Sequence, residues 1–211
     1  MPPILDPSVA DYLKRVAHHG EPVLLEMEAL ARELDFPIIG PEVGRLLFQV
    51  ARWTGAKRVF EMGSGYGYST LWFARALPED GRVFHTDSDI RNTERARDFL
   101  RRAGVENRVV FKTGLAGDVL QRTTGEFDVI LIDVDKSQYP ECYELARGRV
   151  RVGGAIITDN LLWDGEVADP QLTDPDVEGI REYTRRMWAD PSFQSSLMPV
   201  RDGVGLSLRI G

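Results

Sequence analysis

Oxygen-bearing side chains follow two apolar runs of the sequence, at positions where they could bind a divalent cation. Residues 127–132 are mostly apolar and are followed by Asp133. Residues 155–158 are followed in the same way by Asp159 and Asn160. Carboxylate and amide oxygens suit Mg²⁺, Ca²⁺ or Mn²⁺ rather than zinc, and three ligands leave positions for a substrate with two adjacent oxygen atoms. The alternative is that Asp159 and Asn160 only form a turn, which both residue types favour.

A glycine-rich stretch earlier in the chain could bring its backbone close to a nucleoside. Residues 63–69 are Gly-Ser-Gly-Tyr-Gly-Tyr-Ser, and Glu61 comes just before them. Glycine has no Cβ and allows close approach, but such stretches also form simple tight turns, and no Gly-Lys-Ser/Thr follows to make a phosphate loop. The Glu61 carboxylate would repel a pyrophosphate. It suits S-adenosylmethionine (SAM), which carries an ammonium, a sulfonium and a ribose diol.

The next β-rich run ends at Asp87, about 20 residues after the glycines, which is the spacing of a carboxylate that binds ribose hydroxyls. The alternative is that Asp87 caps a helix that begins near Ile90, because acids favour that position. His85 lies within the run and is predicted to be a packed residue rather than a base. His18 and His19 are predicted to lie on the solvated side of a helix.

Hydrophobic periodicity changes from helical to strand-like near residue 57. Residues 7–54 carry apolar side chains at helical spacing, which predicts helices that pack in the core or against another subunit. Beyond them, short β-rich runs alternate with amphipathic segments, which predicts βαβ crossovers, a parallel sheet and a closing hairpin. The predicted strands are residues 58–62, 82–86, 108–112, 127–133, 152–158, 193–199 and 204–210.

Length and composition predict a single cytoplasmic domain over residues 1–211, with a helical extension over 1–54 and a core over 55–211. The net charge of −7 disfavours a general affinity for nucleic acid or anionic membranes. The single cysteine, Cys142, rules out an intramolecular disulfide and is predicted to be a packing residue. No apolar run approaches the roughly 18 residues of a membrane span, and residues 1–6 lack the features of a signal peptide.

The motifs together resemble those of the cation-dependent O-methyltransferases, the group that contains the caffeoyl-coenzyme A and catechol O-methyltransferases and bacterial enzymes that methylate a hydroxyuridine in tRNA. Glu-x-Gly-x-x-x-Gly-Tyr-Ser begins at Glu61, Asp-x-x-Lys begins at Asp133, and Asp-Asn begins at Asp159. The resemblance extends from about Pro37 to the C-terminus and includes the closing turn over residues 198–204. It implies an α/β, Rossmann-like class I methyltransferase fold, with a mostly parallel seven-stranded sheet, a C-terminal antiparallel hairpin and N-terminal helices.

The resemblance also implies the roles of individual residues. Asp133, Asp159 and Asn160 match the metal ligands, and Lys136 matches the proposed base, so Asp133 and Lys136 are the expected catalytic residues. Ile39 departs from the plant members, which have a hydroxyl residue there, so only a backbone or packing contact would persist. The residues expected to contact SAM are Ile39, Glu61, Gly63, Ser64, Ser69, Asp87, Leu115, Ala116, Asp133 and Asp135.

The predicted function is divalent-cation-dependent transfer of a methyl group from SAM to a hydroxyl of a small catechol-like or phenolic substrate. Chelation to the cation would stabilise the phenolate, while Lys136 would accept the phenol proton or stabilise the oxyanion. The alternative is a tRNA 5-hydroxyuridine O-methyltransferase, against which stand the net charge and the short, scattered basic clusters. A SAM-binding module without catalysis is a third alternative, which the complete set of Asp133, Lys136, Asp159 and Asn160 disfavours.

Aromatic residues near these motifs are candidate walls for a planar substrate. Tyr68, Tyr139 and Trp163 are the three candidates, and each could equally belong to the core. The N-terminal helices could cover the site or form the contact of a homodimer, which is the expected oligomeric state.

Overall fold

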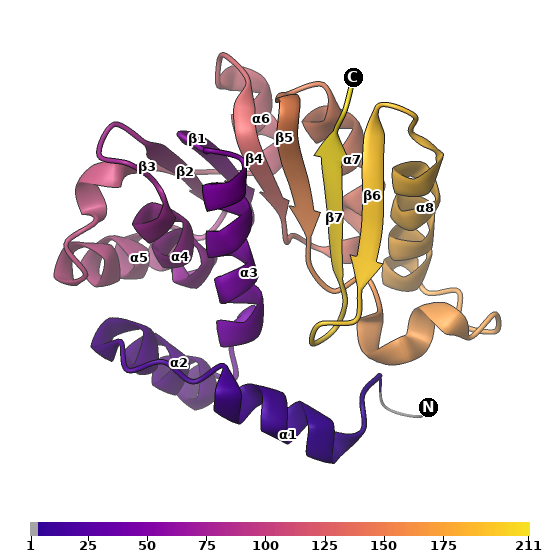
Figure 1. Cartoon of the computed structure of the whole chain (residues 1–211), viewed down its shortest axis with the longest axis horizontal. Helices are drawn as coiled ribbons and strands as arrows, with labels where there is room; N and C mark the ends of the chain where they lie inside the picture. The colour runs from indigo at the N-terminus through magenta and orange to yellow at the C-terminus, as the bar shows by residue number, and fades with distance from the viewer. Residues whose placement is uncertain (1–3) are drawn as a thin grey trace.

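A seven-stranded sheet forms the centre of the structure, a computed structural model that describes residues 4–211 (Figure 1). The strand order is β3-β2-β1-β4-β5-β7-β6; β1 to β5 are parallel, and β7 is antiparallel to both of its neighbours. The predicted class of fold is therefore confirmed. The strands are β1 (Arg58–Met62), β2 (Arg82–Asp87), β3 (Val109–Thr113), β4 (Phe127–Ile132), β5 (Val150–Thr158), β6 (Phe193–Met198) and β7 (Val204–Arg209).

The strands predicted from the sequence are all present, with ends that differ by no more than two residues. The largest difference is at β5, which starts at Val150 because this residue pairs with Phe127 across a register shift in β4. The predicted hairpin turn is also present, since the backbone N–H of Gly203 donates to the carbonyl of Val200 at 3.0 Å.

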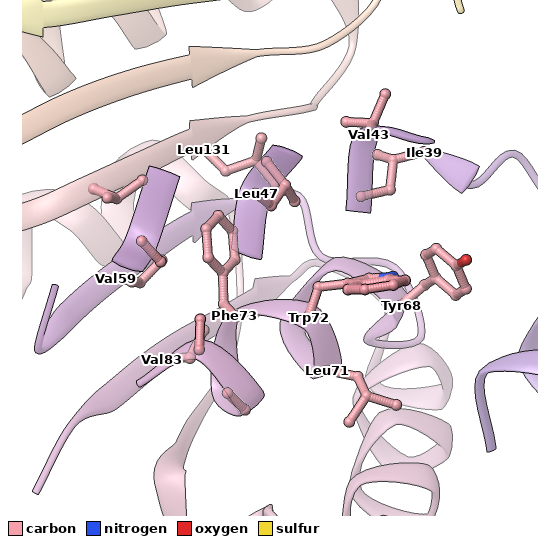
Figure 2. Packing of buried hydrophobic residues seen from close by; sticks show 14 of the residues in the cluster. Ile39, Val43, Leu47, Val59, Tyr68, Leu71, Trp72, Phe73, Val83 and Leu131 are labelled. Carbon is pink, nitrogen blue, oxygen red and sulfur yellow. The ribbon is translucent and has the colours of Figure 1, made fainter. Parts of the chain in front are cut away.

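Helices cover both faces of the sheet, as expected for a mostly parallel sheet. They are α1 (Pro7–Val16), α2 (Pro22–Leu34), α3 (Gly40–Trp53), α4 (Tyr68–Ala76), α5 (Ile90–Arg102), α6 (Ala116–Arg122), α7 (Tyr139–Arg147) and α8 (Pro175–Ala189). Helices α2 to α5 contribute residues to one hydrophobic cluster, and helices α6 to α8 contribute residues to the other. Successive strand residues enter opposite clusters: Val59 packs with the first and Phe60 with the second. Figure 2 shows the first cluster, where Val59 and Leu131 of the sheet lie near Leu47 of α3. Cys142 is buried in α7, as predicted.

The N-terminal segment is helical as predicted, but the prediction that His18 and His19 lie on a helix was wrong. Helix α1 ends at Val16, so His18 and His19 lie in the connection to α2 and not on a helix. The side chain of His19 is largely covered: its Nε2 is 2.9 Å from Oε1 of Glu28, and its ring lies edge-on to Trp72. The prediction of a solvated His19 was therefore wrong, because a hydrogen-bonded contact with Glu28 and an aromatic contact with Trp72, both outside its own segment, cover it.

The order of the strands places a crevice between β1 and β4. The chain moves outward from β1 to β2 and β3 on one side, and from β4 to β5 on the other, so the connections diverge above the carboxyl ends of β1 and β4. Ligands of open α/β sheets bind at such a point.

Among residues 4–211, none of the helices combines the length and apolar character needed to cross a membrane. The signal-peptide prediction rests partly on residues 1–3, which lie outside the described residues, and the division into an extension and a core stays a prediction.

Candidate functional site

A cavity of about 340 Å³ opens at the carboxyl ends of β1, β2 and β4. Except for Glu61, every residue that the sequence predicted for the cofactor, the cation or the chemistry lines this cavity. These residues are Ile39, Gly63, Ser64, Ser69, Asp87, Leu115, Ala116, Asp133, Asp135, Lys136, Asp159 and Asn160. Segments that are far apart in the sequence therefore meet at the predicted position.

The glycine-rich stretch joins β1 to α4 and contains two positions that require glycine. Gly63 has φ +85°, and a Cβ there would overlap the carbonyl oxygen of Asp133 at the end of β4. Gly67 has φ +91°, and a Cβ there would lie 2.9 Å from Cβ of Ala96 in α5. These glycines allow the ends of β1 and β4 to approach and α4 to pack on α5, so they serve the fold as well as the cavity.

Glu61 is fully buried and acts on the cavity wall through a neighbour. Its Oε2 accepts hydrogen bonds from Oγ1 of Thr70 at 2.6 Å and from Oγ of Ser64 at 3.3 Å. Its Oε1 has no hydrogen-bond partner within residues 4–211. Burial raises the pKa of Glu61 to about 7, against the opposing effect of the hydroxyl donors. Ser64 lines the cavity and also accepts from the backbone N–H of Thr86 at 2.9 Å, so Glu61 helps to fix this wall.

Asp87 lies at the end of β2 with its carboxylate at the cavity. Its Oδ1 accepts from the backbone N–H of Asp89 at 2.8 Å and from Nδ2 of Asn92 at 3.2 Å. The N-cap of α5 is Asp89, whose Oδ1 accepts from the backbone N–H of Arg91 at 2.8 Å. The alternative that Asp87 caps this helix is therefore wrong. Burial raises the pKa of Asp87 from its ordinary value.

The expected cation ligands lie together where β4 and β5 end side by side. Ile132 and Thr158 are paired in the sheet, and the residues that follow them are Asp133 and Asp159. Oδ1 of Asp159 is buried and accepts no hydrogen bond from residues 4–211. Burial, and next the nearby Asp133 carboxylate, raises the pKa of Asp159 above its ordinary value. An unpartnered carboxylate oxygen beside a second carboxylate is a position that a cation would stabilise.

The donor set at this edge suits a hard cation. In the described part of the chain, no group of three or more His, Cys, Asp or Glu side chains could hold a metal ion. The third oxygen here belongs instead to the amide of Asn160, whose φ of +58° is one that asparagine tolerates. Two carboxylates and an amide fit Mg²⁺, Mn²⁺ or Ca²⁺, so the residues present are compatible with the expected cation.

Lys136 extends over the same edge. Its Nζ donates to Oδ1 of Asp133 at 3.1 Å and to the carbonyl of Val134 at 3.2 Å, and its side chain is only 12% exposed. Nζ also lies 5.6 Å from the ring centre of Trp163 and 5.3 Å from that of Tyr139. The amine is thus held at the cavity by a carboxylate and two aromatic rings.

The three candidate aromatic walls have different positions. Tyr68 lines the cavity, and its hydroxyl donates to Oε1 of Glu28 at 2.6 Å. Tyr139 is fully buried, and its hydroxyl donates to the carbonyl of Asp159 at 2.9 Å, so it belongs to the core and supports the loop. Trp163 is partly exposed and covers Lys136.

A second cavity of about 500 Å³ lies on the other side of Asp159 and Asn160. The sequence did not predict it, because its walls come from four segments that are far apart in the sequence. The residues shared by both cavities are Ile38, Asp159 and Asn160. The other lining residues are Ile4, Leu5, Ala10, Leu13, Lys14, Glu42, Asp164, Pro199, Val200, Arg201 and Asp202. The one available signal was the closing turn over residues 198–204.

Comparison with known proteins agrees with this geometry. A family model described as O-methyltransferase matches residues 21–210. The catechol O-methyltransferase of Niastella koreensis is 32% identical over 212 residues, which cover 96% of each chain. The caffeoyl-CoA O-methyltransferase of Medicago sativa is 32% identical, over 79% of this chain and 72% of the relative.

A solved structure gives the same result for the fold. The O-methyltransferase from Bacillus cereus, in complex with SAH, superposes with a TM-score of 0.86 and 31% identity, over 96% of this chain and 97% of the other. The family match, the full-length relative and the shared fold all agree with the resemblance seen in the motifs. The chain therefore belongs to the O-methyltransferase family of enzymes.

Proposed function

We propose that this enzyme transfers the methyl group of SAM to a hydroxyl of a small catechol-like or phenolic substrate, with the help of a divalent cation. The observation that carries the proposal is the edge formed by Asp133, Asp159 and Asn160. Two of these residues, Asp159 and Asn160, line both cavities, so this edge separates a space suited to a nucleoside from a space suited to an acceptor.

The first cavity offers the groups that SAM requires. The carboxylate of Asp87 would accept from the ribose hydroxyls, and the backbone near Gly63 and Ser64 would meet the amino-acid part of the cofactor. Leu115 is 63% exposed and would gain from covering by the adenine ring. Ile39 and Ala116 add apolar wall beside it. SAM would supply an already activated methyl group.

The chemistry falls to Lys136 and the carboxylates beside it. Bound at Asp133, Asp159 and Asn160, a cation of the Mg²⁺ type would stabilise the phenolate form of the acceptor. Nζ of Lys136, when neutral, would take the phenol proton; when charged, it would stabilise the phenolate oxygen. Asp133 would hold this amine in place, because their polar atoms are 3.1 Å apart. The two cavities would bring oxygen and methyl group into line.

The second cavity has the character of an acceptor site for an aromatic ring. Ile4, Leu5, Leu13, Pro199 and Val200 give it apolar walls, and Asp159 and Asn160 bring polar groups to it. Charged residues also line it, among them Lys14 and Arg201. Mostly apolar walls with a few convergent polar groups are typical of small-molecule sites. This combination supports a small hydroxylated aromatic substrate over tRNA.

We also infer a homodimer in the cytoplasm. Helix α1 has no buried residue, and its apolar side chains Val9, Tyr12 and Val16 are about half exposed, at 46%, 55% and 57%. A second copy of the chain would cover them. Sedimentation of the purified protein over a range of concentrations measures the oligomeric state.

Transfer of tritium from methyl-labelled SAM tests the proposed activity. Catechols and bulk tRNA are supplied as separate acceptors, with Mg²⁺ or after exhaustive chelation. We expect label in the catechol fraction and only with the cation present. Label in tRNA alone would show that the acceptor is tRNA and not a catechol. Label in neither fraction would favour a protein that binds SAM without transferring its methyl group to these acceptors. The D159N variant is the matched control for the cation site.

A further inference from the structure

Asp202 lies in the turn between β6 and β7, and two backbone hydrogen bonds fix this turn against the loop after β5. The backbone N–H of Leu161 donates to the carbonyl of Gly203 at 3.0 Å, and that of Leu162 donates to the carbonyl of Asp202 at 2.9 Å. Gly203 has φ +89°, and a Cβ there would lie 2.5 Å from Cγ of Leu162. The position of the Asp202 side chain is therefore set by the backbone on both sides.

Both carboxylate oxygens of Asp202 accept hydrogen bonds from that loop. Oδ2 accepts from Nδ2 of Asn160 at 3.1 Å, and Oδ1 accepts from the backbone N–H of Asp164 at 2.7 Å. The second bond stabilises a turn in which Trp163, Asp164 and Gly165 all have positive φ, of +47°, +50° and +87°. This is the turn that presents Trp163 to Lys136.

The first bond decides which way the amide of Asn160 faces. An amide has one accepting oxygen and one donating nitrogen, whereas an ionised carboxylate only accepts. The NH₂ group of Asn160 must therefore face Asp202, and its Oδ1 faces the other way. Without Asp202, the two orientations of the amide would differ little, and one of them would point N–H groups at a bound cation.

We propose that Asp202 is a positioning residue that orients the Asn160 amide so that its oxygen, and not its nitrogen, is presented to the divalent cation. The inference rests on the cation site of the proposed function. It predicts that Asp202 itself does not ligate the cation, because its two oxygens are engaged by Asn160 and Asp164. Residues that orient metal ligands in this way typically contribute 10- to 100-fold to metal affinity, and about that range is expected here.

The test is Mn²⁺ binding to the purified protein, measured by calorimetry and by electron paramagnetic resonance, without substrate. In D202N the new amide keeps its oxygen for the N–H of Asp164 and turns its NH₂ toward Asn160, which forces the Asn160 amide to flip. We expect D202N to raise the Kd for Mn²⁺ by about 10- to 100-fold. D11N is the matched control for charge, because Asp11 of α1 is exposed, lines neither cavity, and its side chain makes no hydrogen bond within residues 4–211. It should change the Kd by less than about fivefold.

The same substitution in an N160D background separates orientation from simple charge. In N160D the group at position 160 is a carboxylate. The carboxylate of Asp202 would repel it, whereas the NH₂ group introduced by D202N would donate a hydrogen bond to it. We therefore expect D202N to weaken Mn²⁺ binding when Asn160 is intact and not to weaken it in N160D. Circular dichroism and urea unfolding of each variant ensure that only folded protein is compared.

Each other outcome overturns the inference. Equal weakening by D202N in both backgrounds would make Asp202 a ligand or a source of charge. A D202N effect no larger than that of D11N would give Asp202 no orienting role, while the cation site of the proposed function stands. A wild-type protein that binds no Mn²⁺ at Asp133 and Asp159 would overturn both the cation site and this inference, and the D159N variant identifies that case.

Discussion

Replacement of Asp87 by alanine tests the cofactor site most directly. Asp87 lines the first cavity at the end of β2, and both hydrogen bonds that it accepts from α5 and its N-terminal turn go to Oδ1. If Asp87 binds the ribose, Oδ2 is the oxygen that would accept from it. Because α5 is capped by Asp89, the loss of Asp87 removes no helix cap.

The expected loss follows from the number and type of bonds. A hydrogen bond to a charged group contributes about 1.5–3 kcal/mol, and alanine removes the carboxylate entirely. Asp87→Ala should therefore bind SAM or SAH about 10- to 150-fold more weakly than the wild type. Isothermal titration calorimetry on protein shown to be folded by circular dichroism measures this directly.

Asp89→Ala is the matched control. Asp89 lies two residues away, carries the same charge, caps α5 and does not line the cavity. This variant should lose about 1 kcal/mol of unfolding free energy, the usual contribution of an N-cap, and should keep its cofactor affinity. An unchanged affinity in Asp87→Ala, or an equal loss of affinity in Asp89→Ala, would refute the assignment of the ribose to Asp87.

Three further predictions concern the chemistry, the cation and the fold. Lys136→Met should lower kcat by about 10²–10⁴-fold while SAM affinity hardly changes, with a smaller loss for catechols of low pKa; equal rates across a catechol series would remove Lys136 from the mechanism. Chelation should abolish turnover, and Mg²⁺ or Mn²⁺ should restore it; full turnover after exhaustive chelation would contradict the cation site. Burial lowers the pKa of His85 from 6.5 to about 4, so stability from neutral His85 is present above pH 6.5 and is lost as the pH falls toward 4. Between pH 7 and pH 4, the wild type should lose about 3 kcal/mol more unfolding free energy than His85→Gln, measured by urea unfolding. If the stability difference between the two proteins is the same at both pH values, His85 is accessible to protons in the folded protein.

The sheet could be predicted from the sequence because its strands are buried on both faces. In β4, Val129 packs with one hydrophobic cluster and Ile130 with the other, so the strand appears as a continuous apolar run. The acids that follow such runs, Asp133 and Asp159, then fall at one edge because parallel strands share their carboxyl ends. Periodicity alone was sufficient for that part of the site.

The direction of single side chains could not be predicted in the same way. Glu61 belongs to the motif that identifies the glycine-rich stretch, yet it is fully buried and bonded to Thr70 and Ser64. Tyr139 follows Lys136 closely in sequence, yet its ring lies in the core against Tyr183. Which partner covers a residue depends on contacts between distant segments, and a local pattern does not contain them.

The walls of the second cavity could not be predicted either, for the same reason. Leu13 of α1 and Val200 of the β6–β7 turn both line it, although most of the chain separates them in sequence. Helix α1 was predicted as a helix from its apolar stripe, but the stripe could not show that Leu13 and Lys14 line the second cavity. The cavity could be seen only in the folded structure, which brings α1 and the β6–β7 turn together.

The β6–β7 turn connects the walls of both cavities through Arg201. Its Nη2 donates to the carbonyl of Ile38 at 3.2 Å, its Nη1 lies 3.6 Å from Oε2 of Glu42, and its guanidinium fills the space where a Cβ of Gly40 would lie. Arg201 itself has φ +51°, a conformation that costs energy for a residue with a side chain and persists only when surrounding contacts favour it. Ile38 lines both cavities, while Arg201 and its neighbour Asp202 line the second. One short turn therefore holds the wall near Ile38 on one side and the amide of Asn160 on the other, so the two cavities share a single structural support.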